Sequence, residues 1–294
     1  MEDLNAYTPE EIILANLAEL SGRFDALREQ LSAHLRELAL ELSAGMGDGT
    51  AFLSSLADHG ADLDRLLPPP DADRAKAYLA LELRRLLPRD GTQWLDWYLP
   101  AGDEPSAAAH NRIAYQRNRF TDEAFTRFST LLRDARAAYP HTFRAVCDEV
   151  AGGTCEYCIL PVESSGEGRL HAFTSLIEAY GLKIVAVCTV PIGDGRETLY
   201  ALLRRSLLRR SLLPLRTPDG TPWWSEISCD TSGRGPEGIL GGAALCGMVP
   251  EYAEFRRGSL RAVFPPDGDL PAFLLFLSLA YPHFEITGLF RHPK

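Results

Sequence analysis

Residues 155–170 read CEYCILPVESSGEGRL, and this stretch indicates an α/β unit. Its first half is rich in β-branched and aromatic residues, which predicts a strand. A polar turn from Pro161 to Gly168 follows, and a helix is expected to begin near Arg169. Such a turn places hydroxyls beside free backbone N–H groups, which suits an anion or a carboxylate, and Glu163 could add an acid or base. A plain capped turn is the alternative.

The two cysteines of this stretch do not predict a metal site. Cys155 and Cys158 are three residues apart, so in an extended strand their side chains point to opposite faces. The other four cysteines stand singly, and a structural zinc site needs a second pair of ligands. We expect buried, reduced thiols and neither a metal nor another cofactor, with thiol redox chemistry as the alternative.

The N-terminal region predicts a helical domain over residues 1–99. Apolar residues recur at steps of three and four from Ile13 to Leu42, which predicts one long amphipathic helix with a near-heptad seam. Shorter helices are expected at about 49–66 and 71–87. Two interpretations stay open: a small helical bundle, or a seam that joins two copies in a homodimer.

The rest of the chain predicts two further units after a Pro-, Gly- and Ala-rich linker at 99–111. Strands alternate with helices over 111–215, which predicts an α/β lobe with at least partly parallel strands. The order β-α-β-β-α-β over 222–294 predicts a ferredoxin-like sandwich with its helices on one face. The expected fold class is therefore mixed α+β and α/β. The elements expected in the lobe are strands at 112–116, 155–162 and 182–192 and helices at 121–138, 143–150 and 169–180.

Composition argues against two classes of partner. The 294-residue chain has a formal net charge of −10, whereas nucleic acids and anionic membranes are bound by basic surfaces. No run of 18 apolar residues predicts a membrane span. The N-terminal MEDLNAYTPEE lacks the basic-then-apolar pattern of a signal peptide, so a cytoplasmic location is expected.

Three stretches together resemble the first lobe of prephenate dehydratase: RIAYQRNRFTDEAF at 112–125, YPHTFRAVCDEVAGGTCEYCILPVESSGEGRL at 139–170 and LKIVAVCTVPI at 182–192. Phe120 and Thr121 stand where that family has an F-S pair, and the polar turn stands where it has P-I-E-N-S-x-x-G. The resemblance implies a periplasmic-binding-protein-like lobe. It also implies substrate binding by Thr121, Ser164, Gly168 and Arg169, and catalytic roles for Glu163, Ser165 and Thr198.

The last segment is similar to the ACT domain that follows in this family and binds phenylalanine. Gly238-Ile239-Leu240 resembles its G-A-L motif, and Glu254 and Arg256 fall on its E-S-R-P motif. The resemblance implies that these five residues bind a regulatory aromatic amino acid. The N-terminal helices stand where bifunctional members carry a chorismate mutase, and whether they keep that function is left open.

Two departures from the family bear on activity. Only about 30 residues separate Ile192 from Trp223, so the family's second lobe has no counterpart of similar length and the lobe is expected to be truncated. The family's catalytic Thr-Arg-Phe falls on Thr198-Leu199-Tyr200, where leucine replaces the arginine. Two functions compete: a lyase that dehydrates or decarboxylates prephenate or a related acid, and an impaired relative that binds an aromatic amino acid or cyclohexadienyl acid. The lost arginine favours the second.

A repeat of L-L-R-R-S at 201–216 forms a local basic patch in this acidic chain. A solvated arginine face is the simpler interpretation. A carboxylate clamp is the alternative, because guanidinium groups bind carboxylates bidentately. The arginines concerned are Arg204, Arg205, Arg209 and Arg210.

Overall fold

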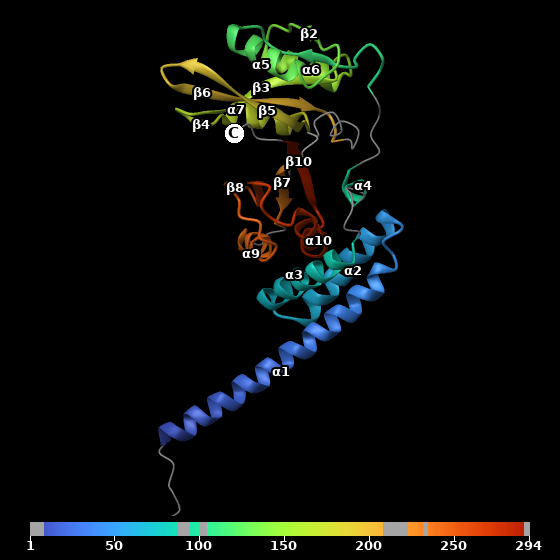
Figure 1. Cartoon of the computed structure of the whole chain (residues 1–294), viewed down its shortest axis with the longest axis vertical. Helices are drawn as coiled ribbons and strands as arrows, with labels where there is room; N and C mark the ends of the chain where they lie inside the picture. Colours follow the sequence, from blue (N-terminus) through green and yellow to red (C-terminus); the bar gives the residue numbers. More distant parts are fainter. Residues whose placement is uncertain (1–8, 88–93, 100–104, 208–222, 232–234, 291–294) are drawn as a thin grey trace, which may run out of the picture.

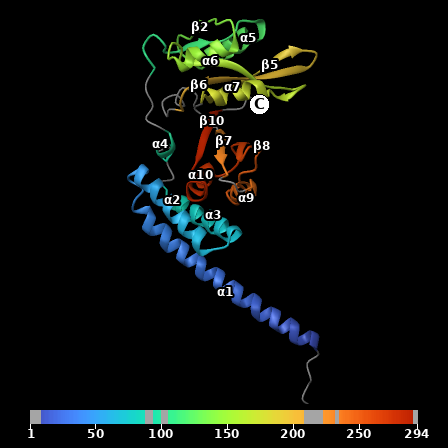
Figure 2. The ribbon, with the colours of Figure 1, turned by 180° about the vertical axis from the view of Figure 1, so that it is seen from behind.

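The computed structural model describes residues 9–87, 94–99, 105–207, 223–231 and 235–290. Figure 1 shows three parts stacked along the long axis: the N-terminal helices, then the C-terminal unit, then the α/β lobe. The view from behind in Figure 2 gives the same order, so the C-terminal unit lies between the other two.

The N-terminal helices form as the sequence predicts. They are α1 (Pro9–Ser43), α2 (Gly49–Leu66), α3 (Pro69–Leu86) and the short α4 (Leu95–Tyr98). Asp48 ends the preceding turn and caps α2, because its carboxylate accepts hydrogen bonds from the backbone N–H groups of Thr50 and Ala51. The seam of α1 changes environment along its length. Leu35, Ala39 and Leu42 are buried, whereas Leu17, Leu20, Phe24, Leu27 and Leu31 are exposed on the part that projects in Figure 1.

The α/β lobe contains three strands that the sequence analysis missed, β2, β4 and β6. Its elements are β1 (Arg112–Ala114), α5 (Arg119–Ser129), β2 (Arg136–Ala138), α6 (Phe143–Ala151), β3 (Tyr157–Ser164), β4 (Gly168–Arg169), α7 (His171–Ala179), β5 (Lys183–Gly193) and β6 (Arg196–Arg204). The helix expected at 121–138 ends at Ser129, and β2 then pairs with β1 in parallel. Three residues are too few to carry a period-two pattern, so β2 leaves no signal of its own in the sequence.

Strand β6 was not predicted, because its C-terminal end belongs to the arginine-rich repeat that was interpreted as a basic patch. A two-residue turn at Asp194 and Gly195, both with positive φ, returns the chain from β5 into an antiparallel hairpin. Ala201, Leu202 and Leu203 are fully buried in β6. The expected solvated arginine face is wrong for Arg204, which is buried, whereas Arg205 is exposed, and Arg209 and Arg210 lie outside the described residues.

The C-terminal unit has the predicted order β-α-β-β-α-β. Its elements are β7 (Trp224–Asp230), α9 (Glu237–Leu245), β8 (Tyr252–Arg256), β9 (Ser259–Phe264), α10 (Leu270–Ala280) and β10 (Phe284–Phe290). Arg257 and Gly258, both with positive φ, make the turn between β8 and β9. Helices α9 and α10 lie against each other, and both contact α3. Because α10 packs between the sheet and the N-terminal helices, Ala272 through Ala280 are all buried.

One mixed sheet runs through the lobe and the C-terminal unit. The strand order is β2-β1-β3-β6-β5-β10-β7-β9-β8, with β4 beside β3. The two parts join where β10 pairs with β5 in parallel, at Gly288 opposite Ile184. A Cβ atom on Gly288 would come 3.1 Å from Ile184 Cβ, so glycine permits the close approach. This continuity had no signal in the sequence.

Candidate functional site

The stretch at 155–170 folds as a strand and a hairpin rather than as a strand, a turn and a helix. Strand β3 extends through Glu163 and Ser164, and β4 returns beside it before α7 begins at His171. The helix N-terminus is preceded by Leu170 and has no side-chain cap. The predicted helix is present but begins two residues after Arg169, because the backbone of Arg169 pairs with that of Glu163.

The hairpin still brings most of the predicted site residues together. In the register of the sheet, Glu163 lies opposite Leu199 of β6 on one side and Arg169 of β4 on the other. Ser164 lies opposite Thr198 on one side and Gly168 on the other. Six of the seven residues that the resemblance implies are therefore neighbours at one end of β3.

Thr121 has a different role. Its Oγ1 donates to the carbonyl of Gln116 at 2.7 Å and accepts from the backbone N–H of Asn118 at 3.0 Å. Asn118 in turn accepts from the backbone N–H of Thr121, which completes a capping box at the start of α5. The buried hydroxyl of Thr121 is thus used within its own helix terminus, and the predicted substrate contact is not supported by its hydrogen bonds.

The hairpin end of β3 is exposed to solvent. The side chain of Glu163 is 48% exposed, and its Oε2 lies 3.9 Å from Arg169 Nε. Ser165 Oγ accepts from the backbone N–H of Glu197 at 2.9 Å, and its own N–H donates to the Glu197 carbonyl. The serine that the resemblance makes catalytic therefore joins the hairpin to β6.

Arg169 reaches away from the hairpin into the C-terminal unit. Its Nη1 lies 3.6 Å from Glu226 Oε2, and its guanidinium stacks 4.5 Å from the centroid of the Tyr252 ring. Glu226 in β7 is fully buried and is also bound by Arg261 of β9. Arg261 also pairs with Glu178 of α7, with 2.9 Å between Arg261 Nη1 and Glu178 Oε1. The four charges form a cluster across the boundary between the lobe and the C-terminal unit.

The electrostatics of this cluster favour its charged form. Burial by itself lowers the pKa of Arg261, but the carboxylates of Glu226 and Glu178 outweigh burial, so the pKa is raised above its ordinary value. Glu226 Oε2 and Arg169 Nε are buried without a hydrogen-bond partner, so Arg169 meets Glu226 by charge alone. Arg169 is therefore committed to the cluster and not to the open hairpin.

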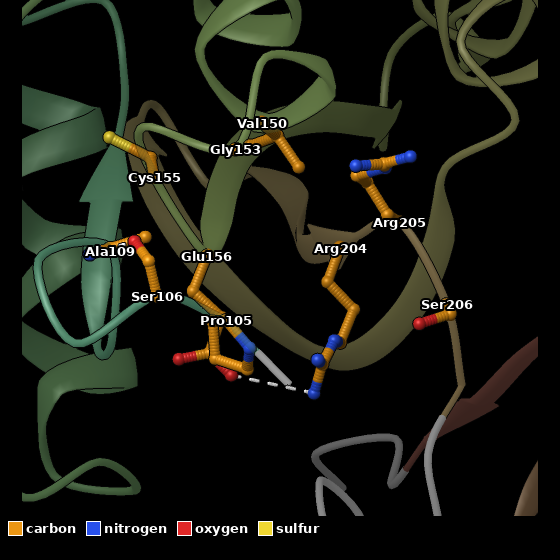
Figure 3. A pocket seen from close by; sticks show the side chains of 10 residues that line it. All are labelled: Pro105, Ser106, Ala109, Val150, Gly153, Cys155, Glu156, Arg204, Arg205 and Ser206. Carbon is orange, nitrogen blue, oxygen red and sulfur yellow. Dashed lines mark hydrogen bonds and ion pairs between the residues drawn. The ribbon is translucent and has the colours of Figure 1, made fainter. Parts of the chain in front are cut away.

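A second pair of buried charges lies at the opposite end of β3 and β6, where sequence reasoning had placed no site. Arg204 Nη1 lies 3.5 Å from Glu156 Oε1, and their side chains are 6% and 5% exposed. Glu156 Oε2 accepts from the backbone N–H of Asn111 at 2.8 Å and lies 3.2 Å from His110 Nδ1. Burial, with the charge of Glu156, raises the pKa of the neighbouring Tyr157. Figure 3 shows the Glu156–Arg204 pair in a cavity of about 310 Å³.

The residues of the expected regulatory site contact different neighbours. Gly238 begins α9 beside Asp73 of α3 and Tyr281, where any side chain would collide with both. Ile239 is buried, and Leu240 packs against the core. A cavity of about 550 Å³ lies between α3 and α9 on the Gly238 side.

The second half of that expected site lies on β8. Glu254 accepts from the Tyr252 hydroxyl at 3.0 Å and lies 4.0 Å from His171 Nδ1, and Arg256 is exposed. The Glu254 carboxylate thus lies close to α7 of the lobe. A shared ligand site for the two motifs stays a prediction.

All six cysteines are free and buried. Cys155 precedes β3, because the backbone N–H groups of Thr154 and Cys155 bond to the Glu149 carbonyl, so the argument from alternating strand faces does not apply to it. A hydrogen bond with Cys147 and burial raise the pKa of Cys158. Within the described residues, no group of three or more His, Cys, Asp or Glu side chains is arranged to hold a metal ion.

The matched family covers the region that contains the hairpin. Residues 113–195 match the prephenate dehydratase family model. The resemblance noted in the sequence is therefore confirmed over this part of the chain. A search of curated proteins gives no match. Among the helices of the described part, none is long and apolar enough to cross a bilayer.

Solved structures with a similar fold include a prephenate dehydratase from Streptococcus mutans, with 19% identity, a TM-score of 0.47, and coverage of 61% of this chain and 97% of that one. A prephenate dehydratase from Arthrobacter aurescens in complex with L-Phe has 14% identity, a TM-score of 0.47, and coverage of 62% and 90%. GqqA, described as a novel type of quorum quenching acylase, has 18% identity, a TM-score of 0.45, and coverage of 62% and 96%.

Proposed function

We propose that this chain is a prephenate-dehydratase-like protein that binds an aromatic amino acid or a related cyclohexadienyl acid and is impaired as a dehydratase. The observation that carries the proposal is the register of β3 and β6. Glu163, the expected acid, lies opposite Leu199, where the resemblance expects an arginine. An apolar side chain packed against the core thus occupies the place of the group that would bind a substrate carboxylate.

The remaining charges of the hairpin do not replace that arginine. In the dehydration of prephenate the ring carboxylate leaves as CO2, its bonding electrons expel the ring hydroxyl, and a proton from an acid turns that hydroxyl into water, so the site needs a cation at the carboxylates and an acid at the departing hydroxyl. Arg169 is the cation nearest Glu163, and it is engaged by the buried Glu226. Loss of one such electrostatic contact costs about a hundredfold in rate or more. We therefore expect weak or absent turnover.

The direct test is conversion of prephenate to phenylpyruvate by the purified protein. We expect a rate at least about a hundredfold below that of an ordinary dehydratase assayed in parallel. The variants Glu163→Gln and Ser165→Ala should leave any residual rate unchanged. Fast turnover that either variant abolishes would instead establish the competing function, an active lyase on prephenate or a related acid. That alternative is favoured by one observation, the clustering of six predicted residues at the hairpin.

The binding half of the proposal has a separate test. The C-terminal β-α-β-β-α-β unit supports an ACT-like role, because its strand order β10-β7-β9-β8 places two helices together on one side. We expect L-Phe to bind the full chain with a measurable heat in titration calorimetry. Absence of any heat with L-Phe, L-Tyr and prephenate would reject a small-molecule role for this chain.

We also propose that the chain forms a homodimer through α1. Its N-terminal half exposes Phe24 at 67% and Leu27 at 61%, on the seam whose later members are buried in the same chain. An isolated helix gains most of its stability by packing such a face. Light scattering at micromolar concentration should give twice the mass of one chain, and Phe24→Glu should shift it to one. A single-chain mass for the wild type would contradict the proposal.

A further inference from the structure

Two cavities adjoin where the three parts of the chain meet. The first is the Glu156–Arg204 cavity of Figure 3. The second has a volume of about 440 Å³ and draws its walls from α4, β5, α10 and β10. Arg205 and Ser206, which follow β6, line both cavities. The larger volume falls within the range of about 300 to 1,000 Å³ that is usual for small-molecule sites.

The larger cavity has aromatic walls. Trp97 and Tyr98 of α4 face it from one side and Phe284 of β10 from another. The centroids of the Tyr98 and Phe284 rings are 5.9 Å apart, which is contact distance for two aromatic groups. A flat apolar ligand group would find ring faces and edges on these walls.

Most polar groups of these walls are already paired inside the protein. The Tyr98 hydroxyl lies 3.2 Å from Ser278 Oγ, and Ser278 Oγ donates to the carbonyl of Leu274 at 2.9 Å. Lys183 forms an ion pair with Glu285. Arg205 differs, because it is exposed and forms no ion pair within the described part of the chain. The cavity thus offers apolar walls and one available guanidinium at its border.

The smaller cavity supplies the opposite charge. Glu156 is buried and lines this cavity, and its Oε1 lies 3.5 Å from the Arg204 guanidinium. In Figure 3 the side chain of Arg204 extends toward Glu156, whereas Arg205 points away from that pair. The carboxylate of Glu156 and the guanidinium of Arg205 thus lie on two sides of the cavities that Arg205 and Ser206 connect. This arrangement is typical of a site for a zwitterion next to an aromatic group.

We propose that the joined cavities bind one aromatic α-amino acid. Its ring lies between Trp97 and Phe284, its carboxylate pairs with Arg205, and its ammonium group faces Glu156. The class of ligand rests on the proposed function, and the location is new: it lies at the junction of the three parts and away from Gly238 and the β8 residues. A ligand there contacts all three parts at once.

Titration calorimetry of the full chain with L-Phe tests the location. We expect Arg205→Ala and Trp97→Ala to weaken binding at least tenfold. A matched variant of an exposed arginine, Arg133→Ala, should bind like the wild type, and Arg256→Ala tests the rival location on β8. Because Trp97 packs against Phe52 at 5.0 Å between ring centroids, its folding is checked by circular dichroism, and Trp97→Phe should restore part of the affinity.

The outcomes separate the two proposals. Wild-type binding that survives Arg205→Ala and Trp97→Ala overturns the location and leaves the proposed function standing. Loss of binding in Arg256→Ala alone places the ligand on β8, as the sequence resemblance implies, and also overturns it. No binding by the wild type rejects the proposed function itself. 3-Phenylpropanoate, which lacks the ammonium group, should bind at least tenfold more weakly than L-Phe, and equal binding overturns the role of Glu156.

Discussion

The two ends of β3 and β6 differ in almost every physical respect. At one end, Glu163 and Ser165 are exposed, and the hairpin of β5 and β6 reaches beyond the helices in Figure 1. At the other end, Glu156 and Arg204 are buried as an ion pair beside a cavity. The family motif falls on the exposed end, whereas buried charge and enclosed volume lie at the other. A motif match thus indicates similarity to a family. Burial indicates where a ligand gains the most binding free energy by leaving water.

The largest expected difference between the two ends is in unfolding free energy, when the first and last residues of β6, Arg196 and Arg204, are each replaced by alanine. Arg204→Ala leaves the buried Glu156 without its charge partner, which should lower the free energy of unfolding by about 3–5 kcal/mol. Arg196→Ala removes a side chain that is 60% exposed, and the change should stay within about 0.5 kcal/mol. Urea unfolding of both variants measures the two values. Equal losses would show that the two ends are energetically alike.

The middle of the same strands gives a pH-dependent test. Cys188 lies opposite Tyr200 of β6, and burial raises the pKa of its thiol to about 12. In the unfolded chain a thiol has a pKa of about 8.5. A raised pKa means that stability is constant below about pH 8.5 and falls as the pH rises toward 12, because only the unfolded state loses the proton.

The variant Cys188→Ala isolates this contribution. Between pH 8.5 and pH 10 the wild type should lose about 1.6 kcal/mol more of its unfolding free energy than the variant does. Urea midpoints at these two pH values, with pH 7 as the reference, provide the measurement. Parallel losses in both proteins would mean that the Cys188 thiol ionises as readily in the folded sheet as in the unfolded chain.

The smallest effect is expected at the hairpin. Ser165→Ala removes the hydroxyl that accepts from the Glu197 backbone N–H, and in this exposed place the loss should be about 0.5–1 kcal/mol. Glu167→Gln, in the same turn, serves as the control and should change stability by less than about 0.5 kcal/mol. Thermal melts resolve such differences when the variants are run together. A loss above about 2 kcal/mol for Ser165→Ala would reveal that the hairpin end is as rigid as the buried end.

Local patterns predicted the longer elements of the fold well. The hydrophobic pattern extends over nine or more residues in the seam of α1, in the apolar run of β5 and across the elements from α9 to β10. This length is sufficient to recognise a periodicity. Strands β2 and β4 have three and two residues, too few for a pattern, and strand β6 was missed because its C-terminal end runs into the arginine-rich repeat. A motif predicted that Glu163, Ser164 and Gly168 are site residues. They lie close together because one hairpin, β3–β4, contains all three.

The sequence by itself determined the longer helices and strands, because hydrophobic periodicity, caps and turn residues act within a few residues along the chain. Three contacts were decided only by the tertiary structure. Arg169 pairs with Glu226, Arg204 pairs with Glu156, and the Thr121 hydroxyl bonds within the start of its own helix. Those outcomes depend on which distant segments approach in space. The net stability of a buried charge comes from the partner that the fold brings to it, and that partner has no fixed distance along the chain.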